Sequence, residues 1–296
     1  MTLIDEMSRR QIVYKTDVET SAISSIRAGG KAKVCLFPKS DRELIEAVCI
    51  CNRYSVKYKV IGCCSNTFFA DEGYDGVIIS SDGLKKINLI GDSIFAGAGV
   101  RLSKLITFAL QTDKSLLPGL YGVPASVGGA VRNNAGAFGD SISDWYKSGI
   151  FYSPSYNRII EITNYDMNFE YRSSKIIGSD LILLEACFRF TNKNKEIIKE
   201  NIADVTAKRR STQPTLPSLG SFFKRNGDFI PSRAIDELGL KGISIGGAGI
   251  SRKHAGFIVN LGDAKARDID KLASFIEAEV LSAFGVSILR EAEFVK

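Results

Sequence analysis

The sequence predicts an α+β protein of about two domains. A single domain typically spans about 100–200 residues, so the 296 residues of the chain are enough for two cores. Short apolar runs separated by glycine or proline turns predict strand hairpins over residues 87–99 and 149–163. Amphipathic periodicity predicts helices over 41–54 and 101–112. Hairpins and amphipathic helices in one chain make up the α+β class.

The composition is that of an ordinary soluble globular protein. Apolar residues make up 45% and charged residues 24% of the chain, and the net charge is +6. Basic and acidic residues are interleaved, whereas a nucleic-acid-binding protein concentrates basic charge on one face. We therefore expect no nucleic-acid partner, and an anionic small molecule explains the positive excess equally well.

Cysteine spacing and the N-terminal sequence narrow the class of protein further. The six cysteines form no C-x-x-C pair and are far in sequence from the single histidine, His254, so no metal site is expected. The N-terminus lacks the apolar core of a signal peptide, and no apolar run reaches the length of a membrane span. We expect a cytoplasmic protein with no membrane insertion.

The elements can be assigned in chain order. Ser40 and Glu43 predict a capping box for the helix over 41–54. That helix and the helix over 101–112 each have one apolar face, formed by Leu44, Ala47, Val48 and Cys51 and by Leu102, Leu105, Ile106 and Ala109. The other expected elements are a strand within 58–67, strands over 76–80 and 181–190, helices over 193–209, 231–238 and 264–283, two strands between the last two helices, and a strand over 285–295.

We place the domain change near residues 200–212. The first domain then covers residues 1–208 and has two subdomains that divide near residue 80. A second domain covers residues 209–284. The C-terminal strand, 285–296, is expected to return toward the first domain.

Residues 119–139 read GLYGVPASVGGAVRNNAGAFG and contain six glycines, where the chain average of 27 in 296 predicts about two. Such a density is unlike a helix or a strand, and it lets the backbone approach a bound group and take positive φ. We interpret the stretch as a wall of exposed amides around an anion such as a diphosphate. A tightly packed turn is the alternative interpretation.

A second signal lies about sixty residues upstream. Residues 58–67, YKVIGCCSNT, lead an apolar strand into a turn with small polar side chains, and residues 71–79 supply another strand. A strand, a turn suited to an anion and a second strand make up half of a nucleotide site.

Together these two stretches resemble the flavin-binding domain of the UDP-N-acetylenolpyruvoylglucosamine reductase (MurB) family, in the vanillyl-alcohol-oxidase group of FAD proteins. Residues 122–139 match the family pattern Gly-Ile-Pro-Gly-Ser-Val-Gly-Gly-Ala-x-x-x-Asn-Ala-Gly-Ala-Tyr-Gly, and the resemblance extends over about residues 20–295. It implies an FAD-binding PCMH-type domain of two α+β subdomains, followed by a smaller α/β substrate-binding domain. The FAD is expected to be noncovalent, because the flavin half has no histidine for a covalent link.

The resemblance also implies a reaction. NADPH would reduce UDP-N-acetylglucosamine enolpyruvate to UDP-N-acetylmuramate through FAD, in the peptidoglycan synthesis on which cell shape and cell division depend. By matched motifs, Arg172 would polarise the substrate carboxylate, Ser221 would protonate the neighbouring carbon, and Glu291 would be the C-terminal catalytic glutamate. Glu293 is the competitor of Glu291, because strand alternation puts both on one face. The aromatic residues that follow Ser221 favour a packed, water-poor pocket around it.

Matched positions imply the remaining contacts. The expected cofactor-binding residues are Ile61, Gly62, Cys63, Cys64, Ser65, Asn66, Gly122, Ser126, Gly128, Gly129, Asn134 and Gly136. The expected substrate-binding residues are Tyr171, Gln213, Lys224, Lys241 and His254.

Several positions depart from the family pattern. Cys63 and Cys64 replace two glycines of the strand-end turn, so any positive φ there would be strained. Ala125 replaces another glycine, and Arg225 stands where the family has asparagine. Residues 212–269 are too few to hold a tyrosine-bearing insertion, which favours the family branch without one.

Two alternative functions stay open at this stage. One is another noncovalent-FAD oxidoreductase of the same superfamily, and the other is a catalytically inactive flavin-binding protein. The sequence leaves open the preference for NADPH over NADH and the oligomeric state.

Overall fold

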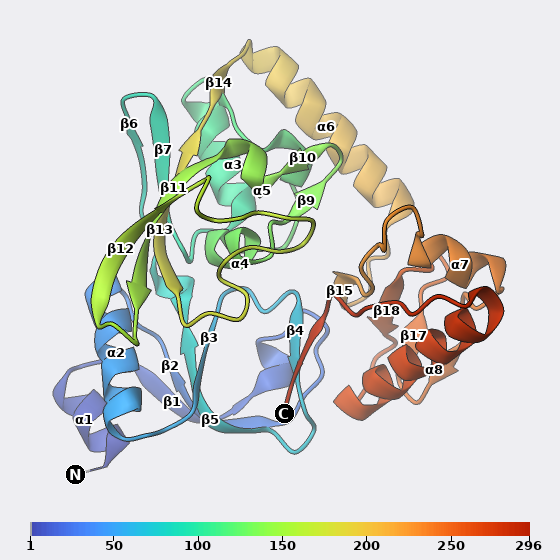
Figure 1. The fold of residues 1–296 in the computed structure, drawn as a ribbon, viewed down its shortest axis with the longest axis horizontal. Helices are drawn as coiled ribbons and strands as arrows, with labels where there is room; N and C mark the ends of the chain where they lie inside the picture. Colours follow the sequence, from blue (N-terminus) through green and yellow to red (C-terminus); the bar gives the residue numbers. More distant parts are fainter. Residues whose placement is uncertain (1) are drawn as a thin grey trace. The chain divides into compact units, whose positions relative to one another are not determined.

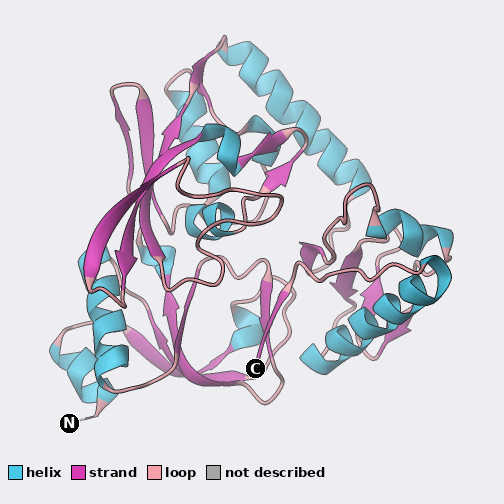
Figure 2. Cartoon of the chain, viewed as in Figure 1, coloured by secondary structure: helices cyan, strands magenta, loops and turns pink. Residues whose placement is uncertain are grey.

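The computed structural model describes residues 2–296, and the chain forms two compact units (Figures 1 and 2). Unit 1 comprises Met1–Lys15, Val34–Cys63 and Gly76–Lys208, and unit 2 comprises Thr16–Lys33, Cys64–Asp75 and Arg209–Lys296. Unit 1 ends within the region 200–212 where the sequence predicts a domain change. It is not the continuous stretch 1–208 of that prediction, because two early segments fold with the C-terminal part of the chain.

The largest sheet of unit 1 is antiparallel and has the order β12-β11-β13-β7-β6 (Figure 1). Its strands are β6 (Ile87–Ile90), β7 (Ser93–Gly97), β11 (Tyr146–Ser153), β12 (Arg158–Thr163) and β13 (Ile182–Arg189). The predicted hairpins over 87–99 and 149–163 are confirmed as β6-β7 and β11-β12. The predicted strand over 181–190 is confirmed as β13.

The other strands of this part of the chain form smaller sheets. A four-stranded sheet has the order β1-β2-β5-β3, and β3 pairs with β5 in parallel. Two-stranded ladders join β9 to β10 and β8 to β14. Their bounds are β1 (Tyr14–Glu19), β2 (Lys31–Leu36), β3 (Tyr58–Ile61), β5 (Tyr74–Ser80), β8 (Lys114–Ser115), β9 (Gly136–Ala137), β10 (Asp140–Ser141) and β14 (Thr191–Asn192). The chain passes from one unit to the other within β1, β2 and β5.

The predicted helices over 41–54 and 101–112 are confirmed, and their predicted apolar faces are buried. The capping box at Ser40 forms only in part: Ser40 Oγ accepts the amide of Glu43 at 3.2 Å, but the Glu43 carboxylate accepts the amide of Lys39. The helices that begin in unit 1 are α1 (Leu3–Arg9), α2 (Asp41–Arg53), α3 (Leu102–Gln111), α4 (Val127–Arg132), α5 (Ile142–Trp145) and α6 (Lys195–Thr212). Among residues 2–296, no helix combines the length and apolarity needed to cross a membrane.

Unit 2 has its own antiparallel sheet, in the order β15-β18-β17-β16, and its own apolar core. The strands are β15 (Ser218–Ser221), β16 (Ser244–Ile245), β17 (Ala248–Ile250) and β18 (Phe257–Asn260), and the helices are α7 (Pro231–Glu237) and α8 (Ala266–Phe284). Three strands follow α7, where the sequence predicts two, because residues 244–250 turn back at Gly246 (φ +53°) into a separate short hairpin.

Hydrogen bonds explain why the two early segments belong to unit 2. The Asp71 carboxylate accepts the amides of Ala266 and Arg267 at 2.8 and 3.1 Å, in the first turn of α8. These amides have no partner within the helix, and the positive end of the helix dipole favours an acid. The Asn260 side chain donates to the carbonyl of Ile26 at 2.9 Å. Residues distant in sequence thus supply each other's missing partners.

The C-terminal strand is shorter than predicted. β19 (Glu293–Val295) pairs in parallel with β4 (Thr67–Phe69), and the rings of Phe68 and Phe294 stack 4.6 Å apart. The strand meets residues from the first 208, as expected, but those residues belong to unit 2. Residues 289–292 are not a regular strand, because they bond to residues 222–224 instead.

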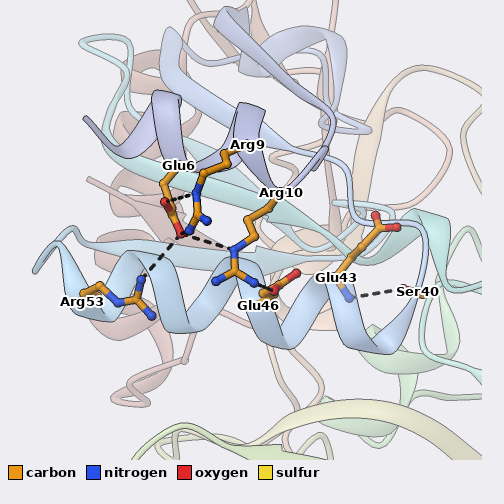
Figure 3. A network of polar contacts seen from close by, with 7 residues as sticks. All are labelled: Glu6, Arg9, Arg10, Ser40, Glu43, Glu46 and Arg53. Carbon is orange, nitrogen blue, oxygen red and sulfur yellow. Dashed lines mark hydrogen bonds and ion pairs between the residues drawn. The ribbon is translucent and has the colours of Figure 1, made fainter. Parts of the chain in front are cut away.

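A buried acid joins the first two helices (Figure 3). The side chain of Glu6 is 0% exposed and lies 2.6 Å from Arg9 Nη2, 3.3 Å from Arg10 Nε and 3.7 Å from Arg53 Nη1. Hydrogen bonds from Arg9 hold the pKa of Glu6 below its usual value, against the opposing effect of burial. The acid therefore stabilises the fold in its ionised form.

We predict that Glu6→Gln lowers the free energy of unfolding at pH 7, because three arginines then face a neutral amide. The folded-state pKa of Glu6 is depressed, so its contribution is complete above the pKa of the unfolded chain and is lost as the pH falls through the folded-state value. Urea unfolding should show the two proteins converging below about pH 4. Glu196→Gln, at an exposed pair with Lys199, is the control that should change nothing at either pH. An equal difference at pH 7 and pH 3 would contradict the account.

Candidate active site

Part of the glycine-rich stretch is a helix, contrary to the expectation from its composition. α4 (Val127–Arg132) contains Gly128 and Gly129 in its first turn, and Ser126 Oγ caps it by accepting the amide of Gly129 at 3.3 Å. A Cβ at Gly128 would lie 3.2 Å from the Cβ of Ala98. The glycines allow α4 to pack closely against Ala98. This packing and the Ser126 cap offset the poor helix propensity of glycine.

The amides at the start of α4 are not exposed. The amides of Val127 and Gly128 donate to the carbonyls of Val100 and Ala98, each at 2.8 Å. The predicted wall of free amides is therefore wrong at these positions. Gly122 differs, since it is exposed and has φ +82°, a conformation that glycine adopts without strain.

The strand-end turn and the glycine-rich stretch meet within unit 1. Gly62 follows β3, and a Cβ at this position would lie 2.0 Å from Ser126 Oγ. The carbonyl of Ile61 accepts a hydrogen bond from Ser81 Oγ at 3.1 Å, which fixes the strand end. Only glycine allows this approach, so the two motifs are in direct contact, although they are sixty residues apart in sequence.

The turn supplies backbone donors. Within residues 2–296, no protein acceptor bonds the amides of Gly62, Cys63, Ser65 or Asn66. Burial raises the pKa of the Cys63 thiol, and Arg101 and a hydrogen bond with Ser126 offset this only in part. Cys63 is therefore a neutral thiol at pH 7. A donor-rich turn with uncharged side chains suits a phosphate group.

Cys64 has the strained backbone that the sequence anticipates. Its φ is +48°, whereas Cys63 is outside the left-handed region. The residue is buried, its Sγ lies 3.4 Å from the carbonyl of Thr67, and its own carbonyl accepts the amide of Ser25 at 3.1 Å. A side chain in this conformation costs roughly 1–2 kcal/mol relative to glycine.

Arg172 lies in a strained two-residue turn of unit 1. Glu170 and Ser173 exchange two backbone hydrogen bonds of 3.2 Å, and Arg172, between them, has φ +54°. Its guanidinium carbon lies 5.1 Å from the ring centroid of Tyr171, which is exposed. Glycine or asparagine usually occupies a position with this φ, so an arginine here lowers the local stability of the turn.

Three hydrogen bonds hold this turn to the glycine-rich stretch. Arg172 Nη2 donates to the carbonyl of Gly136 at 2.6 Å. Asn134 Nδ2 donates to the carbonyl of Glu170 at 2.9 Å, and Ser174 Oγ donates to the carbonyl of Arg132 at 2.6 Å. Unit 1 thus brings Tyr171 and Arg172 against the predicted cofactor-binding residues 134 and 136.

Ser221 ends β15 in unit 2, directly after an irregularity in the β15-β18 ladder. Gly220 has φ +76°, and such a bulge re-aims the following side chain. Ser221 is exposed, whereas Phe222 and Phe223 are buried, and Phe222 packs near Phe68 in the core of unit 2. The expected water-poor pocket around Ser221 is therefore wrong for this structure, because the aromatic rings point into the core.

The segment that carries Glu291 is anchored on both sides. The amide of Glu291 donates to the carbonyl of Phe222 at 2.8 Å, and its carbonyl accepts from Asn66 Nδ2 at 2.9 Å. The amide of Lys224 donates to the carbonyl of Leu289, also at 2.8 Å. Unit 2 thus brings Asn66, Lys224 and Glu291 next to the main chain that follows Ser221. The competitor Glu293 lies in β19, with its carboxylate 3.4 Å from Thr67 Oγ1.

Arg290, which was not among the predicted site residues, fixes the same segment to α8. Its guanidinium lies 2.6 Å from Glu277 and 2.8 Å from Ser274, and it also bonds Asp270. The one available signal was the polar spacing of residues 270, 274 and 277, which places them on one helix face. A nearby cation stabilises two acids on one helix face, and Arg290 is the cation beside Asp270 and Glu277.

The remaining predicted substrate contacts have protein partners in unit 2. Lys241 Nζ lies 2.6 Å from an oxygen of Asp236, and Gln213 Oε1 accepts from Arg209 at 2.9 Å. His254 Nδ1 accepts the amide of Gly256 at 3.1 Å, and burial lowers the pKa of its imidazole. His254 is therefore neutral at pH 7 with its proton on Nε2.

Comparison with known proteins assigns both parts of the chain. The FAD binding domain family matches residues 32–150, and the C-terminal domain family of UDP-N-acetylenolpyruvoylglucosamine reductase matches residues 213–295. The chain is 36% identical over 287 residues to the UDP-N-acetylenolpyruvoylglucosamine reductase of Caldicellulosiruptor bescii, covering 96% of this chain and 91% of that protein. It is 35% identical to the Listeria welshimeri protein of the same name, covering 96% of each.

Solved structures agree in fold. The crystal structure of the Thermus caldophilus UDP-N-acetylenolpyruvylglucosamine reductase (MurB) superposes with a TM-score of 0.82 at 29% identity, covering 96% of this chain and 99% of that one. A Physcomitrella patens BBE-like protein shares the fold over 65% of this chain and 45% of its own, with a TM-score of 0.52 and 16% identity. The predicted α+β class with an FAD-binding domain is confirmed. With this identity maintained across almost its whole length, the chain belongs to the UDP-N-acetylenolpyruvoylglucosamine reductase family.

Proposed function

We propose that this protein catalyses the NADPH-dependent reduction of UDP-N-acetylglucosamine enolpyruvate to UDP-N-acetylmuramate, with noncovalent FAD. The product is a peptidoglycan precursor, so the activity would serve cell-wall growth and division, and we place it in the cytoplasm with its nucleotide substrates. The observation that carries the proposal is Arg172. It has an unfavourable backbone conformation, and three hydrogen bonds, one of them from its own guanidinium, hold its turn against the glycine-rich stretch of the flavin domain.

The residues of unit 1 fit FAD. Gly62 and Cys63 present amides that have no protein acceptor in the described chain, beside the capped start of α4. Ser65 and Asn66, which follow in the same turn, already belong to unit 2, and their amides likewise have no protein acceptor in the described chain. When bound, FAD supplies the two-electron transfer between NADPH and the enolpyruvyl carbon. The backbone donors of the turn would hold its diphosphate, and the flavin half has no histidine for a covalent link.

Arg172 supports the substrate carboxylate. Reduction of an enolpyruvyl group moves electron density onto that carboxylate, and a guanidinium fork stabilises it through two parallel hydrogen bonds. The contact with the Gly136 carbonyl uses one nitrogen and fixes the direction of the side chain. Lysine has no such fork, so it is a poor substitute at this position.

Ser221 donates a proton to the carbon next to the reduced one, and Glu291 assists it. Ser221 is exposed at the end of β15, where a ligand can reach its hydroxyl. The backbone of Glu291 bonds to Phe222 and Asn66, so the main chain that carries this residue is fixed beside the residue that follows Ser221. These contacts favour Glu291 over Glu293, whose carboxylate lies against Thr67.

The experiment that tests the function is the visible spectrum of the purified protein under anaerobic conditions. We predict a flavin spectrum that NADPH bleaches and that the enolpyruvyl substrate restores, with UDP-N-acetylglucosamine as the control that does not restore it. A spectrum that NADPH cannot bleach would identify an inactive flavin-binding protein. Bleaching without restoration would identify a different oxidoreductase.

Ser221→Ala should separate the two half-reactions. Bleaching by NADPH should stay near the wild-type rate, and restoration by substrate should slow by about 10²–10⁴-fold, the usual contribution of a general acid. Ser218→Ala, in the same strand, is the matched control. Stopped-flow absorbance measures both rates, and equal loss of both in Ser221→Ala would exclude the acid role.

The two cysteines of the turn should respond oppositely to glycine. At Cys64 (φ +48°), the glycine variant should be more stable than the alanine variant by about 1 kcal/mol, because alanine keeps the strain. At Cys63 the alanine variant should be the more stable, by about 0.4–1 kcal/mol. Urea unfolding measures both pairs. FAD affinity should not fall in either glycine variant, and a clear fall would mean that the thiols themselves contact the cofactor.

A further inference from the structure

The side chain of Asn134 is bonded at both ends to the protein backbone. Its Nδ2 donates to the carbonyl of Glu170 at 2.9 Å, and its Oδ1 accepts the amide of Ser143 at 3.0 Å. The residue is 7% exposed. A buried amide that is satisfied in this way links three segments of the chain, and removing either bond leaves a buried polar group without its partner.

The backbone of Asn134 suits this bracing role. Its φ is +40°, and asparagine tolerates the left-handed region better than other residues with a side chain. Its amide and that of Ala135 donate back to Val131 and Ala130, so residue 134 lies in the turn that closes α4. The position of the Asn134 side chain is therefore set by the end of the helix.

The braced segment is the strained turn that carries Arg172. Asn134 holds the carbonyl of Glu170 on one flank of the turn, and Ser174 is held on the other flank by the carbonyl of Arg132. Arg172 at φ +54° is costly, and such a conformation persists only where the surroundings determine it. Loss of one flank would allow the turn to relax and Arg172 to move.

We infer that Asn134 is a positioning residue for Arg172 and acts on substrate reduction through that arginine, rather than as the cofactor contact that the family motif implies. The inference rests on the proposed role of Arg172. A misplacement of about 1 Å in a catalytic group lowers the rate by about 10²-fold. Asn134 variants should therefore lose substrate reduction without losing FAD.

Asn134→Asp tests this with minimal change. Aspartate keeps the shape, the tolerance of positive φ and the acceptor for the Ser143 amide, but it turns an oxygen toward the Glu170 carbonyl in place of the donor. We expect restoration of the flavin spectrum by the enolpyruvyl substrate to slow by about 10²-fold, with FAD affinity and bleaching by NADPH unchanged. Asn134→Gly keeps the backbone conformation and removes both side-chain hydrogen bonds of residue 134, and it should behave in the same way.

Asn164→Asp is the matched control. Asn164 Nδ2 donates to the carbonyls of Ser143 and Tyr146, both at 2.8 Å, so the same substitution breaks bonds of the same kind within unit 1. It has no bond to residues 170–174, and it should leave both half-reactions unchanged even if its stability falls as much as that of Asn134→Asp.

A double-mutant cycle with Arg172→Lys completes the test. If Asn134 acts through Arg172, Asn134→Asp should have little further effect in the Arg172→Lys background. Fully multiplicative effects, weakened FAD binding, or behaviour of Asn134→Asp like Asn164→Asp would each overturn the inference. If the proposed function itself were wrong, the result would differ: in the Arg172→Lys variant, the enolpyruvyl substrate would restore the flavin spectrum at the wild-type rate.

Discussion

The contact between Gly62 and Ser126 is the constraint on which the flavin domain depends. There is no room for a Cβ at Gly62, since it would lie 2.0 Å from Ser126 Oγ. Ser126 also caps α4, so the same hydroxyl fixes where the helix begins and how closely the end of β3 approaches it. The donor-rich turn therefore stays next to the glycine-rich stretch, because Gly62 packs directly against the Ser126 side chain that caps α4.

Most of the helices and the hairpins could be predicted, because neighbouring residues in the sequence determine them. The apolar faces of α2 and α3 and the turns of β6-β7 and β11-β12 depend on residues a few positions apart. α4 was missed for the opposite reason. Its glycines have low helix propensity, and tertiary contacts with Ala98 and Val100 decide the outcome. The composition of the two units was missed because Asp71 and Asn260 act across nearly two hundred residues or more.

The sequence suggested which residues form the candidate site but not how they are arranged. Motif matching indicated Arg172 and Ser221, yet no pattern shows that Arg172 has a left-handed backbone or that Phe222 turns away from Ser221 into the core. The amide of Gly128 was expected to face a ligand and instead bonds to Ala98, because the packing of α4 supplies a closer acceptor. Arg290 was not predicted, because its partners Ser274 and Glu277 lie in the preceding helix, α8.

The parallel pairing of β19 with β4 has a consequence for biosynthesis. β4 leaves the ribosome early, whereas its partner strand follows 226 residues later in the sequence. The edge of β4 and the face of Phe68 that stacks on Phe294 therefore stay uncovered until residues 293–295 have been synthesised. Until residues 293–295 have been made, an apolar strand edge of unit 2 is open to chaperones or to aggregation.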